Sequence, residues 1–167
     1  MFMASTSTPA TTLLKREKVD HRVHEYSHDP KSGSYGSEAV DVLGERLGVA
    51  AAQILKTLVI SLSDGSLAVA VIPVPDTLSL KAAAGALGGG KAAMAERAAA
   101  ERATGYVLGG ISPLGQRKRL RTVVDASAQQ WQRVLCSAGR RGLEIELAPA
   151  DLIRLTDAVV APVASGR

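Results

Sequence analysis

Two apolar stretches in the middle of the chain are separated by a short polar turn. Residues 54–62 and 67–74 are rich in Val, Ile and Leu, and the SDGS turn between them contains Asp64-Gly65. An Asp-Gly pair between two such runs is a strong hairpin signal, because glycine accepts the positive φ that tight hairpin turns need. The pattern therefore predicts an antiparallel hairpin here.

Helix signals lie on both sides of this hairpin. Thr8 before Pro9 is typical of a capped helix start, and we expect that helix to run to about Val19. A cap at Ser37 predicts a second helix that ends at Gly48 and turns Val40, Leu43 and Leu47 inward. Three further helices are expected at 79–87, before the triple glycine, at about 92–102, and from Pro149 onward.

Further strands are expected before and after the hairpin. In 143–147, Leu143, Ile145 and Leu147 alternate with Glu144 and Glu146, as in a half-buried strand. The other expected strands are 21–28, 105–108, 121–125, 133–137 and 157–163, with a helical turn at 127–131. Helices and strands in this mixed order predict a single α/β domain over 8–163 with a mixed sheet, not a doubly wound one. Residues 1–7 are expected to be a disordered tail, and 29–36 a loop rich in Gly and Ser.

Composition and charge narrow the possible partners. The 167 residues include only 3% aromatics, which argues against a protein that stacks many bases of single-stranded nucleic acid on its rings. The net charge of +4 is unevenly distributed, because segment 115–141 carries seven basic residues against Asp125 alone. A local excess of this kind favours a phosphate-bearing partner. We therefore expect Arg117, Lys118, Arg119, Arg140 and Arg141 to bind such a partner, although a basic run of this kind is often only a solvated edge.

Cysteine and histidine usage argues against metal chemistry and against secretion. Cys136 is the only cysteine, so disulfide frameworks, zinc ribbons and iron–sulfur clusters are excluded, and its apolar neighbours predict a buried structural thiol. Of the three histidines, His24 and His28 share a strand face while His21 does not, so we expect no metal and no cofactor. No signal peptide and no membrane span is evident, and a soluble cytoplasmic protein is expected.

Lys56 and two glycine-bearing loops are the candidates for chemistry. Lys56 interrupts the apolar run ILKTLVI, so it either faces solvent or binds an anionic group. Segment 109–113, GGISP, can point backbone N–H groups at an oxyanion or phosphate, and the backbone N–H groups of 109–112 are our candidate oxyanion donors. A plain tight turn remains the alternative for this segment and for SAGRRG at 137–142.

Three segments closely resemble the YbaK/EbsC family of aminoacyl-tRNA deacylases: ILKTLVI at 54–60, TGYVLGGISPLGQRKRL at 104–120 and SAGRRGLEIELAPADL at 137–152. The resemblance implies a mixed, curved, partly barrel-like sheet with flanking helices. It implies that Lys56 is essential and contacts the phosphate or ribose of the acceptor end. It places Tyr26 and Thr57 in the pocket and Ser137 in a second loop. It assigns the loop that holds the aminoacyl ester to Gly109, Gly110, Ile111, Ser112 and Pro113.

Glu144 stands where this family usually has Asp, so the carboxylate is kept but displaced by one methylene. The resemblance is stronger to the branch that removes cysteine from cysteinyl-tRNA(Pro), and also from cysteinyl-tRNA(Cys), with the substrate's own thiol attacking the ester. The implied partners are the aminoacyl-tRNA acceptor end and prolyl-tRNA synthetase. Two alternatives stay open: a deacylase for another aminoacyl group such as alanyl-tRNA(Pro), and a non-catalytic module that binds tRNA or a synthetase.

Overall fold

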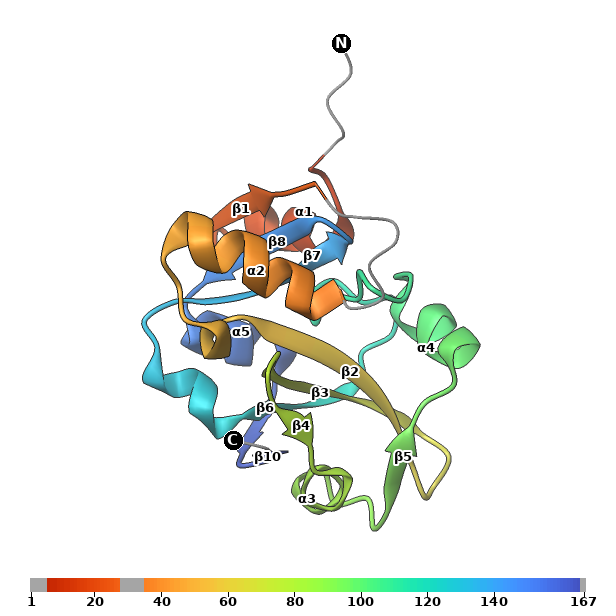
Figure 1. Ribbon diagram of the computed structural model, residues 1–167. Helices are drawn as coiled ribbons and strands as arrows, with labels where there is room; N and C mark the ends of the chain where they lie inside the picture. The colour runs from red at the N-terminus through yellow and green to blue at the C-terminus, as the bar shows by residue number, and fades with distance from the viewer. Residues whose placement is uncertain (1–5, 28–34, 166–167) are drawn as a thin grey trace.

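The predicted hairpin forms the centre of the molecule. The computed structural model describes residues 6–27 and 35–165 (Figure 1). Strands β2 (Leu55–Leu62) and β3 (Leu67–Pro73) pair antiparallel along their length. Asp64 closes the turn by accepting hydrogen bonds from the backbone N–H and the hydroxyl of Ser66, at 2.9 and 2.6 Å. The Asp-Gly prediction is therefore confirmed.

The hairpin lies within a five-stranded sheet of order β5-β2-β3-β6-β9. β5 is antiparallel to β2, whereas β6 runs parallel to β3 and β9 parallel to β6, so the predicted mixed sheet is confirmed. The added strands are β5 (Ala92–Met94), β6 (Arg121–Asp125) and β9 (Val159–Ala161). A second sheet, of order β1-β8-β7, is antiparallel and contains β1 (His21–Glu25), β7 (Val134–Arg140) and β8 (Leu143–Leu147). The two-residue strands β4 (Thr77–Leu78) and β10 (Ala164–Ser165) form a third pair.

The described strands do not close into a barrel. Figure 1 shows β2 strongly curved, but the five- and three-stranded sheets are separate hydrogen-bonded units. A single parallel bridge between Ile54 and Leu135 joins them at the start of β2. The ladder is not continued beyond that bridge, so the partly barrel-like sheet is not confirmed.

Within the described residues, five α-helices surround these sheets. Thr8 caps the first as predicted: its Oγ1 accepts from the Thr11 N–H at 3.1 Å, and the Thr11 Oγ1 accepts from the Thr8 N–H at 2.8 Å. The helices are α1 (Pro9–Arg16), α2 (Tyr35–Leu47), α3 (Leu80–Ala86), α4 (Arg97–Thr104) and α5 (Pro149–Thr156). Short 3-10 turns occur at η1 (Ala51–Gln53) and η2 (Ala126–Gln130). No helix among the described residues is long and apolar enough to cross a membrane.

Two predictions for the alanine-rich region were wrong. The stretch expected to be a helix at 92–102 starts as β5, and α4 begins only at Arg97. Alanine favours helices, but the open edge of β2 offers unsatisfied backbone groups, and pairing with them outweighs this small local preference. The expected strand at 105–108 is a turn, because Gly105 ends α4 with a left-handed φ of 80°.

Three element boundaries also differ from expectation. The first helix ends at Arg16, ahead of Lys18 with its positive φ of 56°, and the second begins at Tyr35 instead of being capped by Ser37. The expected last strand at 157–163 is shortened to β9, because Asp157 is left-handed at one end and Pro162 lacks a donor at the other, and β10 follows beyond it. The predicted tail, apart from residues 6 and 7, and most of the 29–36 loop lie outside the described residues, as does His28.

The two main sheets pack face to face, and helices cover their outer faces. The facing surfaces of the sheets bury Val69, Cys136 and Ile145 together with Leu14 of α1 and Leu152 of α5. The outer face of the five-stranded sheet is covered by α3, and the outer face of the three-stranded sheet by α2. Beside β2, the segment after α4 packs in a small separate cluster. The cavity described next opens where β2, this segment and the β7–β8 hairpin meet.

Candidate active site

A cavity of about 210 Å³ brings together residues that are far apart in the sequence. Its walls come from β2, from the segment after α4 and from the β7–β8 hairpin, with Gly36 of α2 at one side. Nine of the predicted site residues line it: Tyr26, Lys56, Thr57, Gly109, Ile111, Ser137, Arg140, Arg141 and Glu144. The site therefore forms where three chain segments meet, and no single sequence motif contains all of its residues.

Lys56 and Thr57 lie next to each other on β2 and provide polar groups to an otherwise apolar strand. Partial burial lowers the pKa of the Lys56 ammonium from its usual value, and the buried carboxylate of Asp76 acts in the opposite direction. The Thr57 hydroxyl is buried and makes no hydrogen bond with any described residue. A buried hydroxyl without a partner is costly, and a polar group of a bound ligand would satisfy it.

The glycines of the 109–113 loop have different structural roles. Gly109 has a φ of 94°, in the region that favours glycine, and it lines the cavity. Gly110 does not line it: a Cβ there would lie 2.6 Å from the Arg140 Cα, so the loop packs directly on the hairpin backbone. The Gly110 N–H donates to the Val107 carbonyl at 2.9 Å. It is therefore not an available oxyanion donor, and we withdraw it from that role.

Ser112 and Pro113 also lie outside the cavity. Ser112 is completely buried, and its Oγ accepts a hydrogen bond from the Leu114 N–H at 3.2 Å, as in a side-chain-closed turn. Pro113 borders a different, shallow groove. The structure places the first half of the loop at the site and uses the second half as its support. The N–H groups of Gly109 and Ile111 donate to no described acceptor, so they are the remaining candidate donors.

Two residues that the sequence did not single out hold this loop. The Tyr106 hydroxyl donates to the Leu114 carbonyl at 2.6 Å, and burial raises the pKa of Tyr106 to about 12. Glu101 of α4 accepts a hydrogen bond from the Leu108 N–H at 2.8 Å, and this bond lowers the pKa of its carboxyl. The rarity of aromatic residues in this chain could have drawn attention to Tyr106, whereas nothing in the sequence indicated the role of Glu101.

Glu144 is an isolated acid at the inner wall of the cavity. It lies on β8 opposite Ser137 of β7, on the face of the three-stranded sheet that α2 covers. Burial raises its pKa to about 8, and no Lys or Arg of the described chain lies within ion-pair distance. Glu144 is therefore mostly protonated at neutral pH and can donate as well as accept a hydrogen bond.

The basic segment is partly neutralised by the tertiary structure. Five of its seven basic residues meet carboxylates from other segments, at distances of 2.9 to 3.8 Å: Arg119 with Asp157, Arg121 with Asp64, Arg133 with Asp20 and Glu146, Arg140 with Glu25, and Arg141 with Glu38. The large local excess of positive charge inferred from the sequence is therefore offset in space. The candidate nucleic-acid contacts also separate: Arg140 and Arg141 border the cavity, whereas Lys118 and Arg119 border the shallow groove with Pro113. Arg117 is exposed outside both.

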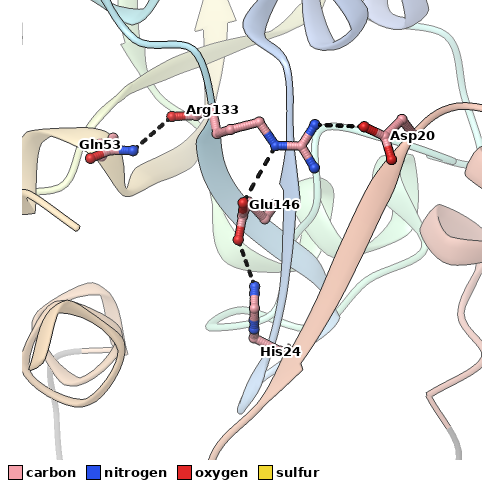
Figure 2. Close-up of polar contacts among 5 residues, drawn as sticks. All are labelled: Asp20, His24, Gln53, Arg133 and Glu146. Atoms are coloured by element: carbon pink, nitrogen blue, oxygen red, sulfur yellow. Dashed lines mark hydrogen bonds and ion pairs between the residues drawn. The ribbon is translucent and has the colours of Figure 1, made fainter. Parts of the chain in front are cut away.

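Histidine takes part in a polar network away from the cavity. The His24 Nε2 lies 2.8 Å from Glu146 Oε1, and Glu146 Oε2 is 3.4 Å from Arg133 Nε (Figure 2). Arg133 also pairs with Asp20 at 3.0 Å, and its carbonyl accepts from the Gln53 amide at 2.9 Å. No group of three His, Cys, Asp or Glu side chains within 6–27 and 35–165 is arranged to hold a metal ion.

Cys136 is fully buried between the sheets, as predicted, and is not a lining residue of the cavity. Burial raises the pKa of its thiol well above the usual range, with the nearby Glu144 adding to the effect. A thiol in this environment stays protonated and is a poor nucleophile. The described lining of the cavity therefore contains hydroxyls, a lysine and a carboxylic acid, but no cysteine or histidine.

Comparison with known proteins shows the family to which this chain belongs. Residues 36–155 match the family model described as the aminoacyl-tRNA editing domain. The EbsC protein of Enterococcus faecalis, provisionally named a Cys-tRNA(Pro)/Cys-tRNA(Cys) deacylase, is 36% identical over 156 residues, which are 93% of this chain and 92% of that protein. The chain therefore belongs to the aminoacyl-tRNA editing domain family and is an aminoacyl-tRNA deacylase.

Two solved structures share the fold over nearly the whole chain. One, described provisionally as a trans-editing enzyme for prolyl tRNA synthetase, superposes with a TM-score of 0.78 at 25% identity, covering 97% of this chain and all of that one. The other, the hypothetical protein APE2540, has a TM-score of 0.82 at 25% identity, covering 95% of this chain and all of that one. The predicted mixed α/β editing fold is confirmed by these similarities.

Proposed function

We propose that this deacylase removes cysteine from mischarged cysteinyl-tRNA(Pro), with cysteinyl-tRNA(Cys) as a further substrate, by using the thiol of the substrate itself. The observation that carries the proposal is the chemistry of the cavity. Its described lining can bind and polarise an ester but contains no cysteine or histidine to attack it, and Cys136 is buried elsewhere. The name of the Enterococcus relative supports the choice of aminoacyl group.

In the proposed reaction the substrate sulfur attacks its own carbonyl carbon. A carbon–sulfur bond forms and the ester bond to the ribose 3′-oxygen breaks, so that the products are a cyclic thiolactone and free tRNA. The thiol proton ends on the 3′-oxygen. Positioning of this kind lowers an intramolecular barrier by up to ~7–11 kcal/mol in the best cases.

The cavity residues then have binding and polarising roles. We assign Lys56 to the phosphate or ribose of the acceptor end, and the free N–H groups of Gly109 and Ile111 to the developing oxyanion. One well-placed donor of this type contributes ~3–4 kcal/mol. Glu144 and Ser137 face each other across β7 and β8 and are placed to hold the polar groups of the aminoacyl moiety.

Contacts with the rest of the tRNA are assigned to basic residues that are exposed or partly exposed. Arg140 lies at the cavity, and Lys118 and Arg119 line the shallow groove. Arg141 is less suitable than the sequence indicated, because its side chain is only 19% exposed and pairs with Glu38. The name of one structural relative supports prolyl-tRNA synthetase as a partner that delivers the mischarged tRNA.

The test is deacylation of a panel of mischarged tRNAs: cysteinyl-tRNA(Pro), seryl-tRNA(Pro) and alanyl-tRNA(Pro). Serine has nearly the shape of cysteine but replaces the thiol with a weakly nucleophilic hydroxyl. We expect fast release of cysteine with thiolactone as the first product, and little release of serine or alanine. Lys56→Ala is expected to lose at least 100-fold in kcat/KM, on the order of 3 kcal/mol.

Lys81→Ala is the matched control, because Lys81 is an exposed lysine on α3, outside the cavity. It should keep wild-type activity. Cleavage of the alanyl or seryl ester as fast as the cysteinyl ester would refute attack by the substrate thiol and favour a different aminoacyl specificity. Full activity of folded Lys56→Ala would refute the assigned site, and tRNA binding without cleavage of any ester would favour a non-catalytic module.

A further inference from the structure

Two neighbouring apolar side chains are exposed in the turn that leads into the cavity wall, and the second of them lines the cavity. Val107 is 65% exposed and Leu108 44% exposed, and they directly precede Gly109. Within the described chain, the other large hydrophobic side chains that are similarly exposed are Met94 and Val159, on β5 and β9. An exposed apolar pair beside a cavity indicates a binding surface more strongly than a scattered single residue does.

The turn that presents this pair is held in place. The Leu108 N–H donates to Glu101 Oε2 at 2.8 Å, and Glu101 is itself paired with Arg97 at 3.3 Å. The Gly110 N–H donates to the Val107 carbonyl at 2.9 Å and closes the turn. These hydrogen bonds therefore hold the backbone of the turn that exposes Val107 and Leu108. Binding to a surface that is already ordered loses less conformational entropy than binding to a mobile one.

We propose that Val107 and Leu108 form an apolar platform for the terminal adenine base of the aminoacyl-tRNA. This inference rests on the proposed function. An ester bound against Gly109 places its ribose at the mouth of the cavity, where Leu108 is also a lining residue. The adenine attached to that ribose then lies outside the cavity, beside the Val107–Leu108 turn. Every tRNA ends in this adenosine, so the platform would serve all tRNAs alike.

The two described tyrosines near the cavity, Tyr26 and Tyr106, do not offer this surface. Base recognition often uses an exposed ring, but Tyr26 and Tyr106 are only 8% and 4% exposed, so neither ring is open for stacking. Aliphatic side chains can cover the face of a base through apolar contact, without reading its hydrogen-bonding edge. The Val107–Leu108 turn is the apolar surface that the described structure presents next to Gly109.

The experiment compares two small esters: 3′-O-cysteinyl-adenosine, and the same cysteinyl ester on a ribose that lacks the base. Wild-type protein should cleave the adenosine ester with a kcat/KM about tenfold higher. Val107→Ser is the main variant, because Val107 lies outside the cavity lining and its change leaves the reacting groups in place. We expect it to slow the adenosine ester about threefold to fivefold and to leave the abasic ester unchanged. With Leu108→Ser added, the preference for the base should fall close to one.

Val159→Ser is the matched control, since it removes the same exposed side chain from β9 at the edge of the five-stranded sheet. It should retain the wild-type preference. Equal rates on the two esters in wild type, or an equal loss on both in Val107→Ser, would overturn the platform. So would a defect of Val107→Ser that occurs only when prolyl-tRNA synthetase is present, because that result assigns the surface to a protein. Failure of wild type to cleave either ester or mischarged tRNA would instead refute the proposed function.

Discussion

Replacing Glu144 with glutamine should stabilise the protein, and increasingly so as the pH rises. Glu144 is only 6% exposed, and burial raises its pKa to about 8 from a usual value of 4.5. Glutamine has nearly the same shape but carries no proton that the folded state must lose. The substitution therefore removes one ionisation from a buried site while keeping a side chain of similar size at this position of β8.

The magnitude follows from the difference in pKa between the folded and unfolded chains. Below pH 4.5 the carboxyl is protonated in both states and has no effect on pH-dependent stability. Between pH 4.5 and about 8 the unfolded chain releases the proton while the folded chain keeps it, so the free energy of unfolding falls as pH rises. Each pH unit in that interval is worth about 1.4 kcal/mol, which gives an upper limit of ~5 kcal/mol, reached above pH 8.

Urea unfolding followed by far-ultraviolet circular dichroism measures this effect. Wild type and Glu144→Gln are compared at pH 5, 6, 7 and 8.5, and their difference in unfolding free energy is plotted against pH. Comparing the two proteins at each pH cancels the titration of all other groups. We expect the difference to move in favour of Glu144→Gln by about 3–5 kcal/mol between pH 5 and 8.5.

Glu146→Gln is the matched control, two residues along the same strand. Glu146 is also partly buried, but its hydrogen bonds with His24 and Arg133 outweigh that burial and lower its pKa (Figure 2). Its contribution to stability is present above its usual pKa and is lost as pH falls, so Glu146→Gln should destabilise the protein at neutral pH. A difference between wild type and Glu144→Gln that stays constant from pH 5 to 8.5 would refute the reasoning for Glu144.

Two further predictions concern packing near the site. Gly110→Ala should lose about 1–3 kcal/mol of stability and about 100-fold in kcat/KM, because the new methyl group would lie 2.6 Å from the Arg140 Cα and must displace the loop. Gly85→Ala, where nothing lies within 4 Å, should instead be neutral or slightly stabilising, and equal effects of the two changes in thermal melts would contradict this account. Cys136→Ala should keep deacylation within about twofold while costing about 1–2 kcal/mol, because the thiol fills the core and does no chemistry. A folded but inactive variant would identify Cys136 as the nucleophile.

Local sequence signals were sufficient to predict elements that are stabilised by residues nearby in the chain. The Thr8 cap and the Asp64 turn form as predicted, because each is closed by hydrogen bonds within a few residues. The alanine-rich stretch was misjudged at 92–94, because its conformation depends on pairing with β2, about thirty residues earlier. The mixed sheet could be predicted from element order. That the strands do not close into a barrel could not be predicted, because it depends on how far the two sheets pair, and only the bridge between Ile54 and Leu135 joins them in the described structure.

By itself, the sequence determined the class of fold, the absence of a framework of paired cysteines, and three segments whose resemblance indicated an editing deacylase. The tertiary structure decided which residues of those segments share a cavity: Gly109 lines it, whereas Gly110 and Ser112 support the loop from behind. It also decided the electrostatics, since Arg141 pairs with Glu38 whereas no Lys or Arg of the described residues pairs with Glu144. The physical reason is the same in both cases. Burial and charge pairing depend on segments brought together from distant parts of the chain, and no local pattern contains that information.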